Sequence, residues 1–158
     1  MTGPRLRVPV LESLLEAAQG AFAGNPRKLV PEERRLLLSI FGLSINLDAV
    51  NLAPTNLGVQ GRPYTLGNTI RIPAHTPFRT NVLVHEMTHV WQYQTKGTGY
   101  LSDSVFHQLV SGQGAYDVTL VPGQSIDDYA AEQQAMIVEK YYEDNPPAGD
   151  STSMSCAC

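Results

Sequence analysis

Cysteine is almost absent from this chain of 158 residues: two occur, Cys156 and Cys158, both within the last three positions. They are too close together for an easy structural disulfide, and no other cysteine offers a partner. The fold must therefore rest on a hydrophobic core, and a hydrophobic content of 42% is enough for one domain of this size. Residues 145–158, rich in Pro, Gly, Ser and Asp, predict a disordered tail.

Long apolar segments are also lacking. The sequence contains no run of about 18 apolar residues, which excludes a transmembrane helix. The first residues lack the apolar core of a secretory signal peptide. We therefore expect no membrane insertion, and either a cytoplasmic location or export by a machine that needs no cleaved signal.

Charge is sparse and slightly acidic. Charged residues make up 16% of the sequence, the formal net charge is −4, and the 11 Lys and Arg are scattered. A nucleic-acid-binding protein needs a basic face. We therefore expect no nucleic-acid partner.

The most informative segment is residues 85–89, His-Glu-Met-Thr-His. Positions i and i+4 lie on the same face of an α-helix, so His85 and His89 can direct two imidazole nitrogens at one metal ion. Glu86 lies about 100° around the helix from His85, where its carboxylate can take a proton from a metal-bound water. This pattern is the HExxH motif of zinc hydrolases.

The flanking residues indicate that the motif lies on an amphipathic helix. Gln92 falls on the same side as the two histidines. We expect Thr76-Pro77 to open this helix and Gly97 to end it. The face opposite to the histidines carries five apolar residues: Leu83, Val84, Met87, Val90 and Trp91. The competing interpretation is an ordinary helix with two histidines on the protein surface.

A catalytic zinc site needs a third protein ligand. A metzincin would carry a third His at position 95, where this sequence has Thr95. Residues 125–142 instead predict a second helix, with Ser125 as N-cap and Asp128 completing a capping box. This helix bears an acidic stripe on one face.

Glu132 lies at the centre of that stripe and is our predicted third ligand. Its neighbour Ala131 is small and leaves room for a close approach of the two helices. Asp128 is an alternative, although a carboxylate in a first turn is also explained by the helix dipole. His75 and His107 are the other histidines and remain further alternatives.

Three segments together resemble a known family. They are TLGNTIRI at 65–72, HEMTHVWQ at 85–92 and AEQQAMIV at 131–138. In combination they are similar to the small bacterial zincin-like domains that are encoded near secretion-system and contractile-injection genes. The resemblance covers residues 44–142.

The resemblance implies a minimal metallopeptidase of the gluzincin type. Its zinc ion, Zn2+, would be held by His85, His89 and Glu132, and the strand Asn68–Pro73 would form the edge of the active-site cleft. A peptide or protein would be the substrate. Components of a secretion system are possible partners.

The hydrophobic pattern predicts an α+β fold. We expect a single domain over residues 1–144, with N-terminal helices in 1–42 and a metallopeptidase-like core in 44–142. In that core the HExxH helix packs on a small sheet and on the helix that carries the third ligand. The expected elements are helices over Val10–Ala23 and Pro31–Phe41, strands over 44–51 and 68–73, a loop over 55–63, and a short helix or irregular segment over 101–110.

The chemistry predicted from these residues is zinc-assisted hydrolysis of an amide bond, with Glu86 as the general base. Such a reaction also needs a donor for the developing oxyanion. Tyr116, Tyr129 and His107 are the candidates, and the sequence does not choose among them.

Other hypotheses assign a different role to the same motif. The domain can be a zinc-binding adaptor or structural component of a secretion or injection apparatus, with little or no turnover. It can also be a relic of the fold that holds no metal. A further hypothesis places a thiolate of Cys156 or Cys158 on the zinc ion as an inhibitor.

Overall fold

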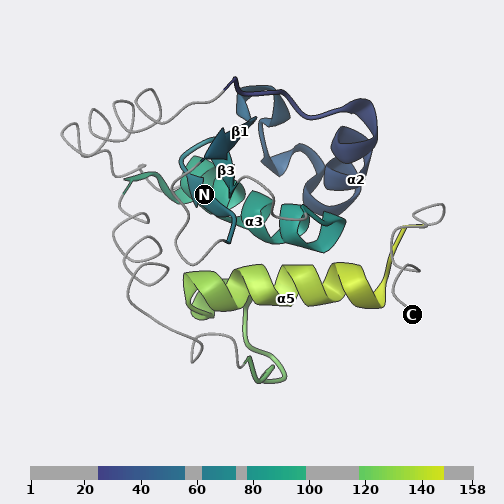
Figure 1. The fold of residues 1–158 in the computed structure, drawn as a ribbon. Helices are drawn as coiled ribbons and strands as arrows, with labels where there is room; N and C mark the ends of the chain where they lie inside the picture. Colours follow the sequence, from purple (N-terminus) through teal and green to yellow (C-terminus); the bar gives the residue numbers. More distant parts are fainter. Residues whose placement is uncertain (1–24, 56–61, 74–77, 99–117, 148–158) are drawn as a thin grey trace.

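The computed structural model describes residues 25–55, 62–73, 78–98 and 118–147 (Figure 1). These residues form an α+β arrangement, as predicted, with three α-helices and one three-stranded sheet. The expected helix over Val10–Ala23, the segment 101–110 and the tail after residue 147 lie outside the described residues. The elements are α2 (Pro31–Phe41), β1 (Asn51–Thr55), β2 (Tyr64–Leu66), β3 (Thr69–Pro73), α3 (Thr80–Lys96) and α5 (Ala131–Asp144), with 3₁₀ turns at Gly42–Ser44, Leu47–Ala49 and Ile126–Asp128.

The predicted helix over Pro31–Phe41 is confirmed as α2, with the same bounds. It begins where the Glu33 carboxylate accepts a hydrogen bond from the backbone N–H of Val30 at 2.9 Å. Leu37 faces the core and is fully buried. Gly42 ends the helix at φ 57, a conformation that side chains disfavour.

The predicted strand over 44–51 is wrong. Residues 42–49 form two 3₁₀ turns, and β1 begins at Asn51 and includes Thr55, which we expected in a loop. The reason lies at Asn46, whose backbone N–H and C=O both bond the side chain of Gln94 on α3, at 2.7 and 3.1 Å. Its own side chain accepts from the N–H of Asp48. Backbone groups engaged in this way are not available to a sheet.

The sheet has the order β1-β3-β2, so β3 is its central strand. It pairs with β1 in parallel and with β2 in antiparallel orientation, through a two-residue turn in which Gly67 has φ 59. The predicted strand over 68–73 is therefore confirmed as β3, and it is a central strand without a free edge. Four of the five residues of β3 are buried, and Arg71 is only 1% exposed. The edge strand next to the site is β2, which we did not predict.

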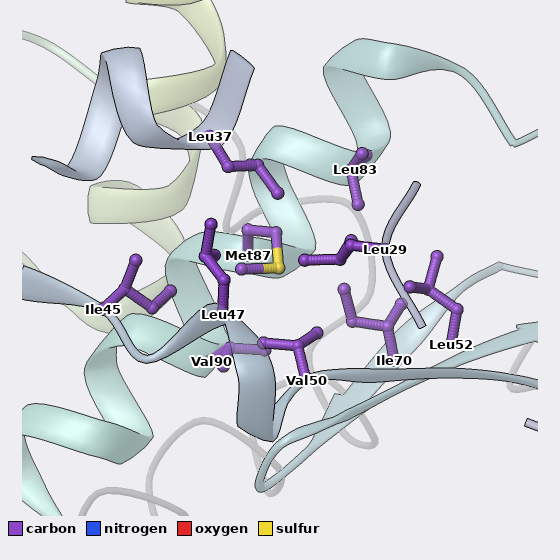
Figure 2. Packing of buried hydrophobic residues seen from close by; sticks show 10 residues of the cluster. All are labelled: Leu29, Leu37, Ile45, Leu47, Val50, Leu52, Ile70, Leu83, Met87 and Val90. Atoms are coloured by element: carbon purple, nitrogen blue, oxygen red, sulfur yellow. The ribbon is translucent and has the colours of Figure 1, made fainter. Parts of the chain in front are cut away.

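Helix α3 lies at the centre of the molecule, between the sheet and α2 on one side and α5 on the other (Figure 1). It ends at Gly97 as predicted, but it begins at Thr80 after Arg79 and not at Thr76-Pro77. Its apolar face supplies residues to the main hydrophobic cluster (Figure 2). The buried members of this cluster are Leu29, Leu37, Ile45, Leu47, Val50, Leu52, Ile70, Leu83, Met87 and Val90.

Helix α5 packs antiparallel to α3, because residues near the start of α3 contact residues near the end of α5. The predicted N-cap Ser125 and its capping box with Asp128 are confirmed, but they cap the 3₁₀ turn Ile126–Asp128. The α-helix itself begins at Ala131, and its N-cap Ala130 lies five residues after the predicted N-cap. No helix among the described residues is long and apolar enough to cross a membrane.

Candidate metal centre

The structure brings His85, His89 and Glu132 together between α3 and α5. Their potential ligand atoms lie within 4.8 Å of one another. Nε2 of His85 is 3.4 Å from one carboxylate oxygen of Glu132, and Nε2 of His89 is 3.3 Å from the other. The local i, i+4 spacing places the two imidazoles, and the packing of α5 on α3 supplies the carboxylate.

The two nitrogen–oxygen separations, each to a different oxygen of Glu132, are close to the spacing of neighbouring ligand atoms in a tetrahedral metal site. Ligand bonds of about 2.0–2.1 Å at tetrahedral angles place neighbouring ligand atoms roughly 3.3 Å apart. Nε2 of His89 and Oε1 of Glu132 are also buried and have no hydrogen-bond partner. Buried polar atoms without a partner are costly, and a cation between them removes that cost. The group can hold a metal ion.

Among the described residues, the alternative ligand Asp128 does not join this group. Asp128 accepts a hydrogen bond from the backbone N–H of Ser125 at 3.0 Å, so its role is that of a cap. The hydroxyl of Tyr129, a candidate oxyanion donor, accepts from the N–H of Val121 at 2.9 Å. The remaining candidates lie outside the described residues: His75, His107, Tyr116, Cys156 and Cys158.

Glu86 lies beside the group and is 4% exposed. Its Oε2 accepts a hydrogen bond of 2.7 Å from the hydroxyl of Thr65, a buried residue in the middle of β2. We did not identify Thr65 from the sequence because we did not predict β2. The signal was present in the Gly67-Asn68 pair, which is typical of a two-residue hairpin turn and would have placed a strand before it.

A second layer of side chains orients the two imidazoles. Nδ1 of His85 is 2.9 Å from a carboxylate oxygen of Glu139, whose other oxygen accepts from the amide of Asn81. Nδ1 of His89 is 2.8 Å from the amide oxygen of Gln92. Both contacts leave Nε2 directed at Glu132. Such outer partners fix the tautomer and the ring orientation of metal-binding histidines.

The electrostatics of the group favour a positive charge at its centre. Burial lowers the pKa of His85, but hydrogen bonds to Glu132 and Glu139 and the nearby carboxylate of Glu86 outweigh it and raise the pKa to about 10. Burial raises the pKa of Glu132, but its contacts with His85 and His89 hold it well below its usual value. Without metal, a proton on His85 supplies the charge that a cation would supply.

The contacts of His85 with Glu132 and Glu139 predict that the stability of the metal-free protein depends on pH. His85 ordinarily titrates near 6.5 and here near 10, so its stabilising contribution is complete below pH 6.5 and is lost as the pH rises to about 10. The free energy of unfolding in urea with a chelator present should therefore fall between pH 6.5 and 9.5. The His85→Asn variant should show a flatter profile. If the free energy of unfolding fell equally with pH in the parent and in the variant, the ion pairs of His85 would not be the cause.

The fold and the group of His85, His89 and Glu132 define the chain as a small α+β domain built around a candidate metal site. No family model matches the sequence. The chain is 31% identical over 160 residues to the type VI secretion system spike protein VgrG2b of Pseudomonas aeruginosa strain PAO1. The match covers 87% of this chain and 15% of that protein, so the chain spans a small part of the length of its curated relative.

A solved structure resembles most of this chain. It is the effector domain of Pseudomonas aeruginosa VgrG2b, with a TM-score of 0.58 and 27% sequence identity. The similarity covers 90% of this chain and 92% of that one. This chain is thus similar in sequence and fold to a domain that belongs to a secretion-system spike protein.

Proposed function

We propose that this chain is a zinc-dependent hydrolase that cleaves peptide bonds in a protein target, as an effector domain associated with a secretion spike. One observation carries the proposal: a buried carboxylate, Glu86, is held beside a group of two imidazoles and one carboxylate that can bind a metal. The hydrogen bond of Glu86 goes to Thr65 and not to a ligand, so orienting a ligand, the role of Glu139, does not account for it. The resemblance to a secretion-system effector domain supports the biological setting.

His85, His89 and Glu132 are the residues that would hold the zinc ion. Bound there, zinc would lower the pKa of a water molecule and polarise the carbonyl of the scissile bond. Glu86 would accept the proton of that water and pass it to the leaving amine. The hydroxyl of Thr65 would keep the Glu86 carboxylate in place for both transfers.

The edge of the sheet offers a place for an extended substrate. Leu66 and Thr69 flank the two-residue turn and therefore form a hydrogen-bonded pair. The next pair, Thr65 and Ile70, is then not hydrogen-bonded, so the backbone N–H and C=O of Thr65 point away from β3. A peptide that adds to β2 as a further strand would pair with these groups, which belong to the same residue whose side chain holds Glu86.

The first test is metal content. We expect the protein purified without added metal to contain about one zinc ion per chain, because three ligands converge on one point. Removal of the ion by a chelator should abolish cleavage of an unfolded protein such as casein and lower the melting temperature, and zinc should restore both. A chain that binds no zinc, even when zinc is supplied, would be a relic of the fold.

The comparisons also favour a second candidate function. Both matches are with a spike protein of a secretion system, so the domain can be a metal-binding adaptor or structural component of the apparatus with little turnover. In that case metal removal would still lower the melting temperature, but Glu86→Gln, which can keep the hydrogen bond from Thr65, would leave the activity of the protein unchanged. Comparing these two treatments separates the two functions.

A further inference from the structure

Two glutamines outside the candidate ligand group are completely buried between α3 and α5. Gln92 is 0% exposed and Gln134 is 1% exposed. Their side chains are joined by a hydrogen bond of 2.9 Å from Nε2 of Gln92 to Oε1 of Gln134. Burying a primary amide is costly unless its donors and acceptors are satisfied. Their partners therefore indicate what these residues do.

The hydrogen-bond partners of this pair allow only one assignment of the amide nitrogens and oxygens. The backbone oxygens of Tyr129 and Ala131 can only accept, and they take Nε2 of Gln134 at 2.8 Å and Nε2 of Gln92 at 3.0 Å. Both amide nitrogens are thereby assigned. The oxygen of Gln92 is left to face Nδ1 of His89 at 2.8 Å, and this nitrogen must carry the hydrogen. Nε2 of His89 is then the nitrogen that points at the metal position.

The same bonds hold the start of α5. Tyr129 and Ala131 lie just before Glu132, where the 3₁₀ turn has ended and the α-helix begins. Both of their carbonyl groups are bonded by the glutamine pair. The segment that carries Glu132 is therefore tied to α3 by side chains, in addition to its apolar packing.

We propose that Gln92 and Gln134 form an amide relay that positions two of the metal ligands at once. The relay fixes Nδ1 of His89 as the protonated nitrogen, and it holds the first turn of α5 at the distance that Glu132 needs. Gln134 contacts no ligand, so it is a positioning residue that acts through Gln92 and through the backbone. This inference rests on the metal binding in the proposed function.

Substitution of Gln134, the glutamine that contacts no ligand, gives the sharpest test. Gln134→Glu keeps the size of the side chain and the acceptor for Gln92, but it places a carboxylate oxygen against the carbonyl of Tyr129. We expect zinc affinity, measured by competition with a chromophoric chelator, to fall about 10- to 100-fold, the usual effect of losing an outer-shell partner. Unchanged affinity would overturn the relay.

A matched control lies one residue away. Gln133 uses its side-chain oxygen to accept from the N–H of Ala130 at 3.1 Å, so Gln133→Glu preserves the bond that it makes. This variant carries the same chemical change on the same turn and should bind zinc like the parent. An equal loss of affinity in both variants would show a general effect of added charge and would overturn the proposal.

Gln92→Glu separates positioning from an electronic effect. A carboxylate on Nδ1 raises the basicity of a metal-binding histidine, and from this effect alone zinc affinity would rise. Gln92→Glu also removes the two hydrogen bonds that Nε2 of Gln92 donates to α5, so we expect zinc affinity to fall. An increase in zinc affinity would overturn the proposal that the glutamine pair holds α5 in position.

A measurement on the parent protein requires no substitution and does not depend on catalysis. Long-range ¹H–¹⁵N NMR of the zinc-loaded protein should show His89 with hydrogen on Nδ1, and an Nε2–H tautomer would overturn the proposal. If the parent binds no zinc, the proposed function fails, while the same spectrum of the metal-free protein still tests the relay. There we expect hydrogen on Nδ1 of His89, and its absence overturns the assignment.

Discussion

Replacement of Glu86 by Gln is expected to abolish hydrolysis while zinc stays bound. The amide keeps the shape of the side chain and can still accept from the hydroxyl of Thr65, but it cannot take a proton from water. A general base contributes about 10²- to 10⁴-fold to the rate. The loss should therefore appear in kcat for cleavage of an unfolded protein or a peptide library, with equal zinc content by elemental analysis.

Substitutions at Thr65 provide the matched comparison. Thr65→Val removes the hydroxyl without changing the volume, and a hydrogen bond to a charged group contributes about 1.5–3 kcal/mol. We expect kcat to fall about 10- to 100-fold, less than for Glu86→Gln, and Thr65→Ser to restore most of it. If Glu86→Gln cleaves as well as the parent, Glu86 is not the base.

Loss of Glu132 is expected to have the largest effect on metal binding. A four-ligand zinc site contributes about 10–16 kcal/mol, so an even share for each ligand is about 2.5–4 kcal/mol, or roughly 10²- to 10³-fold in affinity. Glu132→Ala should therefore be purified with little zinc and lose activity. His85 and His89 alone would leave the ion bound from one helix only.

Asp128→Ala is the control for this substitution. Both carboxylates lie on the segment that the sequence predicted as one acidic helix, but Asp128 caps the 3₁₀ turn and is not part of the metal group. Its removal should leave zinc content unchanged and cost a little stability. A loss of zinc in the Asp128 variant equal to that in the Glu132 variant would mean that the third ligand is wrongly assigned.

Features that depend on local spacing were accessible from the sequence. The end of α3 at Gly97, the bounds of α2 and the capping box of Ser125 follow from residues within one turn of one another. The common face of His85 and His89 follows from the helical repeat alone. These interactions do not depend on the rest of the chain.

Features that depend on contacts between distant residues were mispredicted or missed. Residues 44–50 are not a strand because Gln94, from α3, engages the backbone of Asn46. Strand β2 has only three residues, too few for a clear hydrophobic alternation. Without β2, neither the central position of β3 in the sheet nor the contact of Thr65 with Glu86 could be predicted.

The sequence by itself determined that two imidazoles and a carboxylate share one helix, because the pitch of an α-helix is the same in every protein. It also narrowed the third ligand to a few candidates. Only the tertiary structure decided that Glu132 meets both imidazoles, that Thr65 holds Glu86 and that Gln92 and Gln134 tie α5 to α3. The physical reason is that these contacts depend on the packing of separate elements, and that packing is fixed by the whole buried core.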